Sequence, residues 1–124
     1  MSFDFAKAIV VTQETVTKQF WDVDGRMSKD RFLHFAVIPL VILILLGVLT
    51  SIVSIFSIVS MVFSLAIAAP FIGASIRRVH DQGKVWWYSL IPFYNLYLCF
   101  FVDGDAGTNE FGEPPVDSAT TAAD

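Results

Sequence analysis

The sequence predicts an all-α integral membrane protein with three transmembrane helices and an interfacial N-terminal helix. Hydrophobic residues make up 55% of the chain and the mean hydropathy is +0.63, which is too apolar for an ordinary soluble domain of this size. The stretch 35–76 contains no Asp, Glu, Lys, Arg or His. One crossing of a bilayer takes about 20 helical residues, so this stretch is about two crossings long.

Two crossings within one charge-free stretch predict a helical hairpin over 32–49 and 52–76, with a short turn near 50–54. Pro39 lies inside the first crossing, where a transmembrane helix tolerates proline if a neighbour satisfies the freed carbonyl. Pro70 and Gly73 are expected to bend the end of the second crossing.

A third apolar run, 85–102, is barely long enough to cross, at about 27 Å as a helix. It opens with Trp86, Trp87 and Tyr88, which is typical of an interfacial aromatic belt. Pro92 lies near its middle, so a re-entrant or strongly tilted segment is the alternative.

The chain is predicted to divide into an N-terminal segment with a polar hinge (1–31), a transmembrane domain (32–102) and an acidic, largely disordered tail (103–124). Residues 2–21 favour a short amphipathic helix at the membrane surface, with a loosely ordered tail as the alternative. Ser28 is placed to cap the first crossing.

The charges predict an orientation. Every Lys and Arg lies at or before Lys84, and the hairpin places those of the hinge and of the 77–84 loop on one side. Because positive loops stay cytoplasmic, the N-terminus and this loop are expected inside, and the tail outside if the third run crosses. No basic stripe suited to nucleic acid is present.

Small residues recur every three or four positions along the second crossing. Such residues allow close helix approach in lipid, which predicts a helix-packing face. The alternative is a hydrophilic path, which would require oligomers because three crossings in one copy are too few to enclose one. The face consists of Ser54, Ser57, Ser60, Ser64 and Ala68.

The sequence contains few candidate catalytic residues. His80 and Asp81 are adjacent, and a carboxylate can orient an imidazole, but an isolated pair is a poor signal for an enzyme. The only other histidine, His34, starts the first crossing, and Cys99 is the single cysteine. We therefore expect no catalytic residues, no metal site and no cofactor.

Three polar motifs resemble those of one protein family. A G-R-x-S-K hinge, an R-R-x-H-D-x-G loop before paired tryptophans, and a G-x-N-x-F-G-x-x-P tail occur in this order around the apolar runs. This order is similar to small bacterial inner-membrane proteins catalogued as domain of unknown function 805, over roughly 20–115. The motif residues are Gly25, Arg26, Arg77, Arg78, His80, Asp81, Gly83, Gly107, Asn109, Phe111, Gly112 and Pro115.

The resemblance implies a multi-pass plasma-membrane protein and no established activity. The segment 30–33, where the family more often has an acid, an aromatic and then Trp, departs from the pattern, as does Val85.

The first functional hypothesis is a structural or regulatory membrane module that binds itself, a membrane-protein partner or anionic lipid. Arg26, Arg77 and Arg78 could converge on a lipid phosphate, or Asp81 could simply offset their charge within the fold. The alternative is an oligomeric small-solute or ion transporter or channel subunit.

Overall fold

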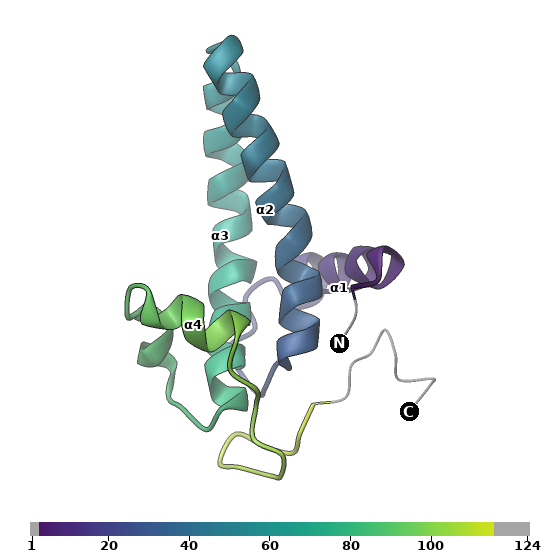
Figure 1. Ribbon diagram of the computed structural model, residues 1–124, viewed down its shortest axis with the longest axis vertical. Coiled ribbons are helices and arrows are strands. Elements are labelled where there is room, and N and C mark those ends of the chain that lie inside the picture. Colours follow the sequence, from purple (N-terminus) through teal and green to yellow (C-terminus); the bar gives the residue numbers. More distant parts are fainter. Residues whose placement is uncertain (1–2, 116–124) are drawn as a thin grey trace.

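The computed structural model describes residues 3–115, and every regular element among them is helical. Two long helices form a hairpin, while two short helices lie beside its base and the C-terminal segment passes beneath it (Figure 1). The elements are α1 (Phe5–Thr17), α2 (Lys29–Ile52), α3 (Phe56–Asp81), the 3₁₀ helix η1 (Trp86–Leu90) and α4 (Tyr94–Phe100).

The predicted hairpin is confirmed by α2 and α3. Their 24 and 26 residues correspond to about 36 and 39 Å, enough to cross a bilayer. In the most apolar 18-residue stretch of each helix, only 28% and 11% of residues are buried. The core helix of a soluble protein is mostly buried, so these two helices indicate a membrane protein.

The start of α2 is fixed by its cap, and its interior proline has a compensating neighbour. The Ser28 hydroxyl accepts a hydrogen bond from the Arg31 amide at 3.1 Å, as the sequence predicts. Pro39 leaves the carbonyl of Phe35 without its helical donor. The Thr12 hydroxyl from α1 lies 3.5 Å from that oxygen and supplies a long hydrogen bond.

Helix α1 crosses the base of the hairpin and is tied to the first turns of α2. Asp4 caps α1, and its own amide donates to His34 Nε2 at 3.0 Å. Lys7 pairs with Asp30 at the start of α2. Phe5 is exposed, as are Ile9 and Val10, so α1 presents apolar side chains outward.

The prediction of one continuous helix over 85–102 is wrong. Ile91 is extended (φ −76°, ψ 114°) because the ring of Pro92 excludes the helical conformation from the residue before it. Phe93 then adopts φ 66°, which reverses the chain before α4 begins. Seven helical residues rise only about 10 Å, so α4 cannot cross a bilayer, and α2 and α3 alone of the described part are long and apolar enough.

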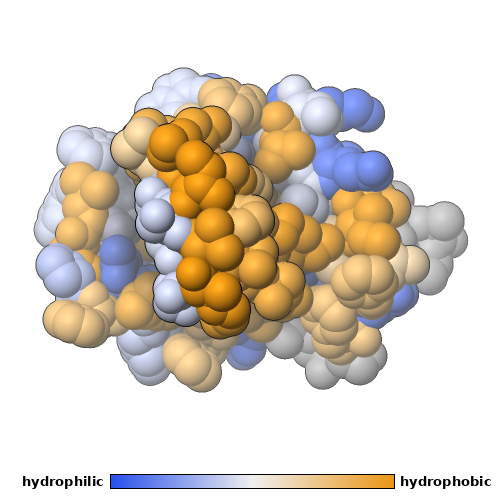
Figure 2. Space-filling view, turned by 90° about the horizontal axis from the view of Figure 1, so that it is seen from above, coloured by the Kyte–Doolittle hydropathy of each residue, from blue (hydrophilic) through white to orange (hydrophobic). Residues whose placement is uncertain are grey.

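The core lies at the base of the hairpin and includes several phenylalanine rings. Phe32 of α2 makes edge-to-face contacts with Phe71 of α3 and with Phe100 of α4, at centroid distances of 5.8 and 5.2 Å. These contacts join three helices at one level. Above that level the outer surfaces of the hairpin are apolar and exposed, and the end facing the viewer in Figure 2 is mostly hydrophobic.

The predicted small-residue face lies along α3 and the turn before it, and its members are mostly exposed. Ser54, Ser57 and Ser64 are exposed, while Ser60 and Ala68 are half-buried. Whether this face packs against another helix stays a prediction.

The described part of the tail lies on the same side of the molecule as the hinge and the 77–84 loop. The amide of Asp105 donates to the carbonyl of Asp81 at 2.7 Å, and Arg26 binds the carbonyl of Gly107. The predicted separation of tail and loop by a third crossing is therefore wrong for residues 103–115. Most of the tail predicted to be largely disordered, residues 116–124, lies outside the described residues.

The packing of α4 predicts an unreactive thiol. Burial raises the pKa of Cys99 from 9.0 to about 11. At pH 8 this leaves roughly 100-fold less thiolate than the ordinary value, so iodoacetamide should label the native protein roughly 100-fold more slowly than the SDS-denatured protein. The native rate should rise with pH up to about 11. Equal rates in the native and denatured states would contradict this packing.

Candidate functional site

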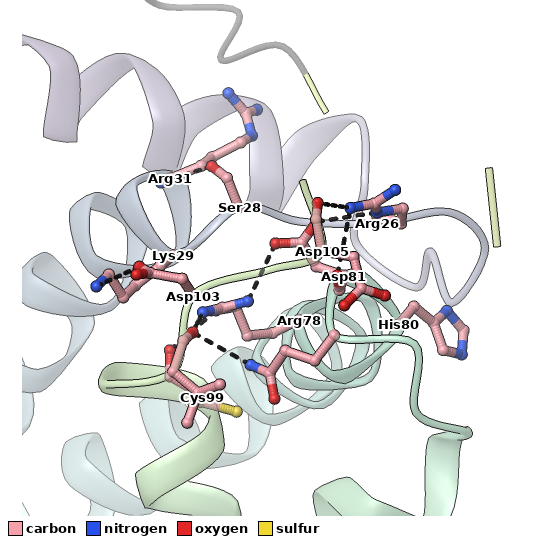
Figure 3. A network of polar contacts seen from close by, with 12 residues as sticks. Arg26, Ser28, Lys29, Arg31, Arg78, His80, Asp81, Cys99, Asp103 and Asp105 are labelled. Atoms are coloured by element: carbon pink, nitrogen blue, oxygen red, sulfur yellow. Dashed lines mark hydrogen bonds and ion pairs between the residues drawn. The ribbon is translucent and has the colours of Figure 1, made fainter. Parts of the chain in front are cut away.

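The three sequence motifs meet at the base of the hairpin, although they are far apart in the chain. Figure 3 shows Arg26 from the hinge, Arg78 and Asp81 from the last turn of α3, and Asp105 from the tail gathered around one point. We call Arg26, Arg78 and Asp81 the arginine–aspartate cluster. All three side chains are at least 96% buried.

Arg26 uses all five of its N–H donors within the chain. Nε donates to Asp81 Oδ1 at 2.9 Å. The four terminal hydrogens have four backbone acceptors: the carbonyls of Gly107 (2.8 Å), Gly112 (3.0 Å), Asp81 (3.3 Å) and Asp105 (2.6 Å). A planar guanidinium has five donors, so Arg26 has none left for a ligand. It acts as a clamp that holds the tail on the hairpin.

Arg78 holds the end of α4 in the same way. Its Nε donates to the carbonyl of Cys99 at 3.1 Å, and its Nη2 donates to the carbonyl of Val102. The last carbonyls of a helix lack intrahelical donors and carry partial negative charge, so a buried cation satisfies them well. Gln82 Nε2 donates to the carbonyl of Leu98 at 2.5 Å and extends this cap.

Asp81 is the only carboxylate in the cluster and lies between its two arginines. Oδ1 accepts from Arg26 and Oδ2 accepts from Arg78 Nη1 at 3.2 Å. The backbone of Gly104 passes directly against this carboxylate, and a Cβ added there would overlap its oxygens. The tail can approach Asp81 only because residue 104 has no side chain.

Gly83 ends α3 and turns the chain. It adopts φ +74°, and its amide donates to the carbonyl of His80 at 2.9 Å. The Lys84 amide donates to the carbonyl of Val79 at 3.0 Å. This pair of bonds is a Schellman motif, which favours glycine at the left-handed position.

The tail motif forms a tight turn that packs on the end of α3. Asn109 and Gly112 exchange two backbone hydrogen bonds of 3.0 Å each. The Asn109 side chain donates to the carbonyl of His80 at 3.1 Å and accepts from the Phe111 amide. The Phe111 ring stacks on the His80 ring at a centroid distance of 4.0 Å.

His80 and Asp81 are not arranged as a catalytic pair. The His80 ring donates through Nδ1 to the carbonyl of Gly25 at 2.9 Å, and it points away from Asp81 in Figure 3. Asp81 is occupied by the two arginines. A carboxylate that orients a catalytic imidazole would have to accept from the ring instead. No group of three or more His, Cys, Asp or Glu side chains in residues 3–115 is placed to hold a metal ion.

Arg77 points elsewhere, into a pocket between α1, the hinge and α3. Its side chain is 3% exposed, and its Nη1 lies 3.7 Å from Asp22 Oδ2. Its Nη2 is buried and has no hydrogen-bond partner within residues 3–115. The pocket has a volume of about 260 Å³, and Pro115 also lines it. Arg77 therefore does not join Arg78 and Asp81 in the cluster, although Arg26 also lines this pocket.

Sequence reasoning identified most of the motif residues but missed several of their partners. Gly104 and Asp105 belong to the tail, and their contacts with Asp81 and Arg26 join segments that are far apart in the sequence. Gln82, which lies between Asp81 and Gly83, was not among the predicted site residues. The glycine at 104 was the one available signal, since a glycine can mark a close backbone approach.

Comparison with known families identifies the chain. The family model described as "Protein of unknown function (DUF805)" matches residues 20–113, so the chain belongs to this family, as the motifs indicated. No curated protein and no solved structure matches the chain.

The close approach at Gly104 predicts a large effect of one methyl group. Gly104→Ala should destabilise the protein by about 2–4 kcal/mol, because the Cβ displaces a buried carboxylate that two arginines hold in place. Gly107→Ala is the matched control, since a Cβ there meets nothing within 4 Å. The measurement is thermal unfolding in detergent, and equal midpoints for the two variants would refute the contact.

The clamp predicts that lysine cannot replace Arg26. Arg26→Lys has three donors instead of five and should expose the tail, with a loss of about 3–5 kcal/mol as for a broken buried ion pair. Hydrogen exchange at the Asp105 amide should accelerate. Lys29→Gln is the control: its ion pair with Asp103 is on the surface and contributes little, so exchange should stay unchanged. Slow exchange in Arg26→Lys would argue against the clamp.

Proposed function

We propose that this member of the DUF805 family is a structural or regulatory membrane module that acts by binding lipid or another membrane protein. The observation that carries the proposal is the complete internal use of the Arg26 donors. The family motifs then serve to assemble a fixed base on a hairpin. The exposed apolar surface above that base can then contact lipid or another membrane protein.

The hairpin crosses the membrane, and α1 and α4 lie in the interface on one side. This placement is supported by side chains that favour the headgroup region. Trp21 is 59% exposed beside α1, while Trp86 and Tyr97 are exposed on η1 and α4. The polar cluster and the tail then lie beneath the interface, next to water. Since the basic hinge and the basic end of α3 share this side, it is the cytoplasmic side of a bacterial inner membrane.

A second candidate is an oligomeric transporter or channel subunit. Its support is the exposed hydroxyl groups of Ser54, Ser57 and Ser64 on an otherwise apolar helix. A hairpin in one copy encloses no path, so this function requires several copies with these faces together. A protein that stays monomeric in mild detergent would count against it.

The proposed placement predicts a distinct labelling pattern. In a Cys99→Ala background, Ser54→Cys at the tip of the hairpin should react with an impermeant maleimide in intact cells. Thr17→Cys on α1 and Thr108→Cys in the tail should react only in inverted vesicles. All three positions are exposed in the fold. Labelling of Thr108→Cys from outside would overturn the placement, and release of the protein by carbonate would overturn membrane insertion.

A further inference from the structure

A second polar site lies beside the arginine–aspartate cluster and is incomplete. Among the described residues, the pocket at the end of α1 is lined by one carboxylate, that of Glu14, and by the cationic side chains of Lys18, Arg26, Arg31 and Arg77. Arg26 is satisfied within the chain, and Arg31 lies 3.7 Å from Glu14. Asp22 offsets part of the charge of Arg77. The lining remains positive.

Two buried polar atoms of this pocket lack hydrogen-bond partners in the part of the chain that the structure describes. One is Arg77 Nη2, a cationic donor, and the other is Gln19 Oε1, an acceptor. A buried charged donor without an acceptor is costly, and native folds rarely keep one. An occupant that satisfies both atoms must accept a hydrogen bond from a guanidinium and donate one to an amide oxygen. A phosphate group that carries or adjoins a hydroxyl does both.

The pocket also has the surroundings of a headgroup site. Phe20 and Trp21 follow Gln19 directly and are exposed. Such side chains anchor a segment at the depth of lipid headgroups. Basic pockets at that depth on the cytoplasmic side bind acidic lipids.

We propose that Lys18, Gln19 and Arg77 form a binding site for a phosphate group bearing or adjoining a hydroxyl, as in the headgroup of an anionic phospholipid. The site lies beside the arginine–aspartate cluster, in which all five donors of Arg26 and each guanidinium nitrogen of Arg78 already have acceptors. That the phosphate belongs to a lipid rests on the proposed membrane function. Inorganic phosphate has the same chemistry, so the test separates the two sources.

The test uses the full chain in detergent. Native mass spectrometry measures retention of phosphatidylglycerol and of phosphatidylcholine, and thermal unfolding measures stabilisation by sodium phosphate against sodium chloride at equal ionic strength. The variants are Lys18→Gln and Arg77→Gln, with Lys84→Gln as the matched control. Lys84 undergoes the same charge change, is half-buried and lies outside the pocket.

The wild type should prefer phosphatidylglycerol to phosphatidylcholine. Lys18→Gln should weaken that retention about fivefold, the effect of one basic contact near a membrane surface, and Lys84→Gln should leave it within about twofold. If sodium phosphate raises the unfolding temperature of the wild type but not of Lys18→Gln, the site also binds free phosphate. Retention of phosphatidylglycerol without such stabilisation assigns it to the lipid.

The site is overturned if Lys18→Gln and Lys84→Gln retain phosphatidylglycerol equally and phosphate does not stabilise the protein. The result for Arg77→Gln does not decide alone, because Arg77 also pairs with Asp22 in the fold. Carbonate extraction distinguishes the two failures. A protein that resists carbonate but shows equal retention loses only the phosphate site. If carbonate releases the protein from the membrane, the proposed membrane function fails, and binding of inorganic phosphate then tests the site on its own.

Discussion

The carboxylate of Asp81 lies between two buried guanidinium groups, and the base of the molecule depends on this arrangement. Without it, Arg26 and Arg78 would face each other as unscreened like charges. Removing one member of a buried pair costs about 3–5 kcal/mol, because the remaining charge stays desolvated. Each arginine also binds carbonyls of a different segment, so the same carboxylate connects the tail to the hinge and α4 to α3.

This connection explains why the third apolar run does not cross. Arg78 binds the carbonyls of Cys99 and Val102, so the end of the run lies at the level of the α3 terminus where the run begins. A spanning helix would place its two ends about 27 Å apart. The chain therefore has to turn back within 85–102, and Pro92 with Phe93 at positive φ provides the turn.

The hairpin and its cap at Ser28 could be predicted because they follow from local properties, a charge-free stretch and a hydroxyl before a helix. The course of the run 85–102 could be predicted only as an alternative, because its composition suits a crossing while Pro92 indicates a break, and the contact from Arg78 that holds its end beside α3 follows from no local pattern. The same limit applies to the site. Arg26, Arg78 and Asp81 were identified as candidates, but the contact of Gly104 with Asp81 depends on two segments whose proximity no local pattern encodes.

Adjacent arginines on one helix illustrate how far their roles can differ. Successive residues of an α-helix point about 100° apart, so Arg78 faces α4 while Arg77 faces α1 and the hinge. Each guanidinium nitrogen of Arg78 has an acceptor in the fold, whereas Arg77 keeps a buried Nη2 without an acceptor among the described residues. A buried donor without an acceptor lowers the stability of the fold, so the hydrogen bonding of the base is satisfied at Arg78 and unsatisfied at Arg77. The motif thus places a residue whose hydrogen bonds complete the fold beside one whose hydrogen bonding is incomplete, and an occupant that supplied the missing acceptor at Arg77 would add stability to the base.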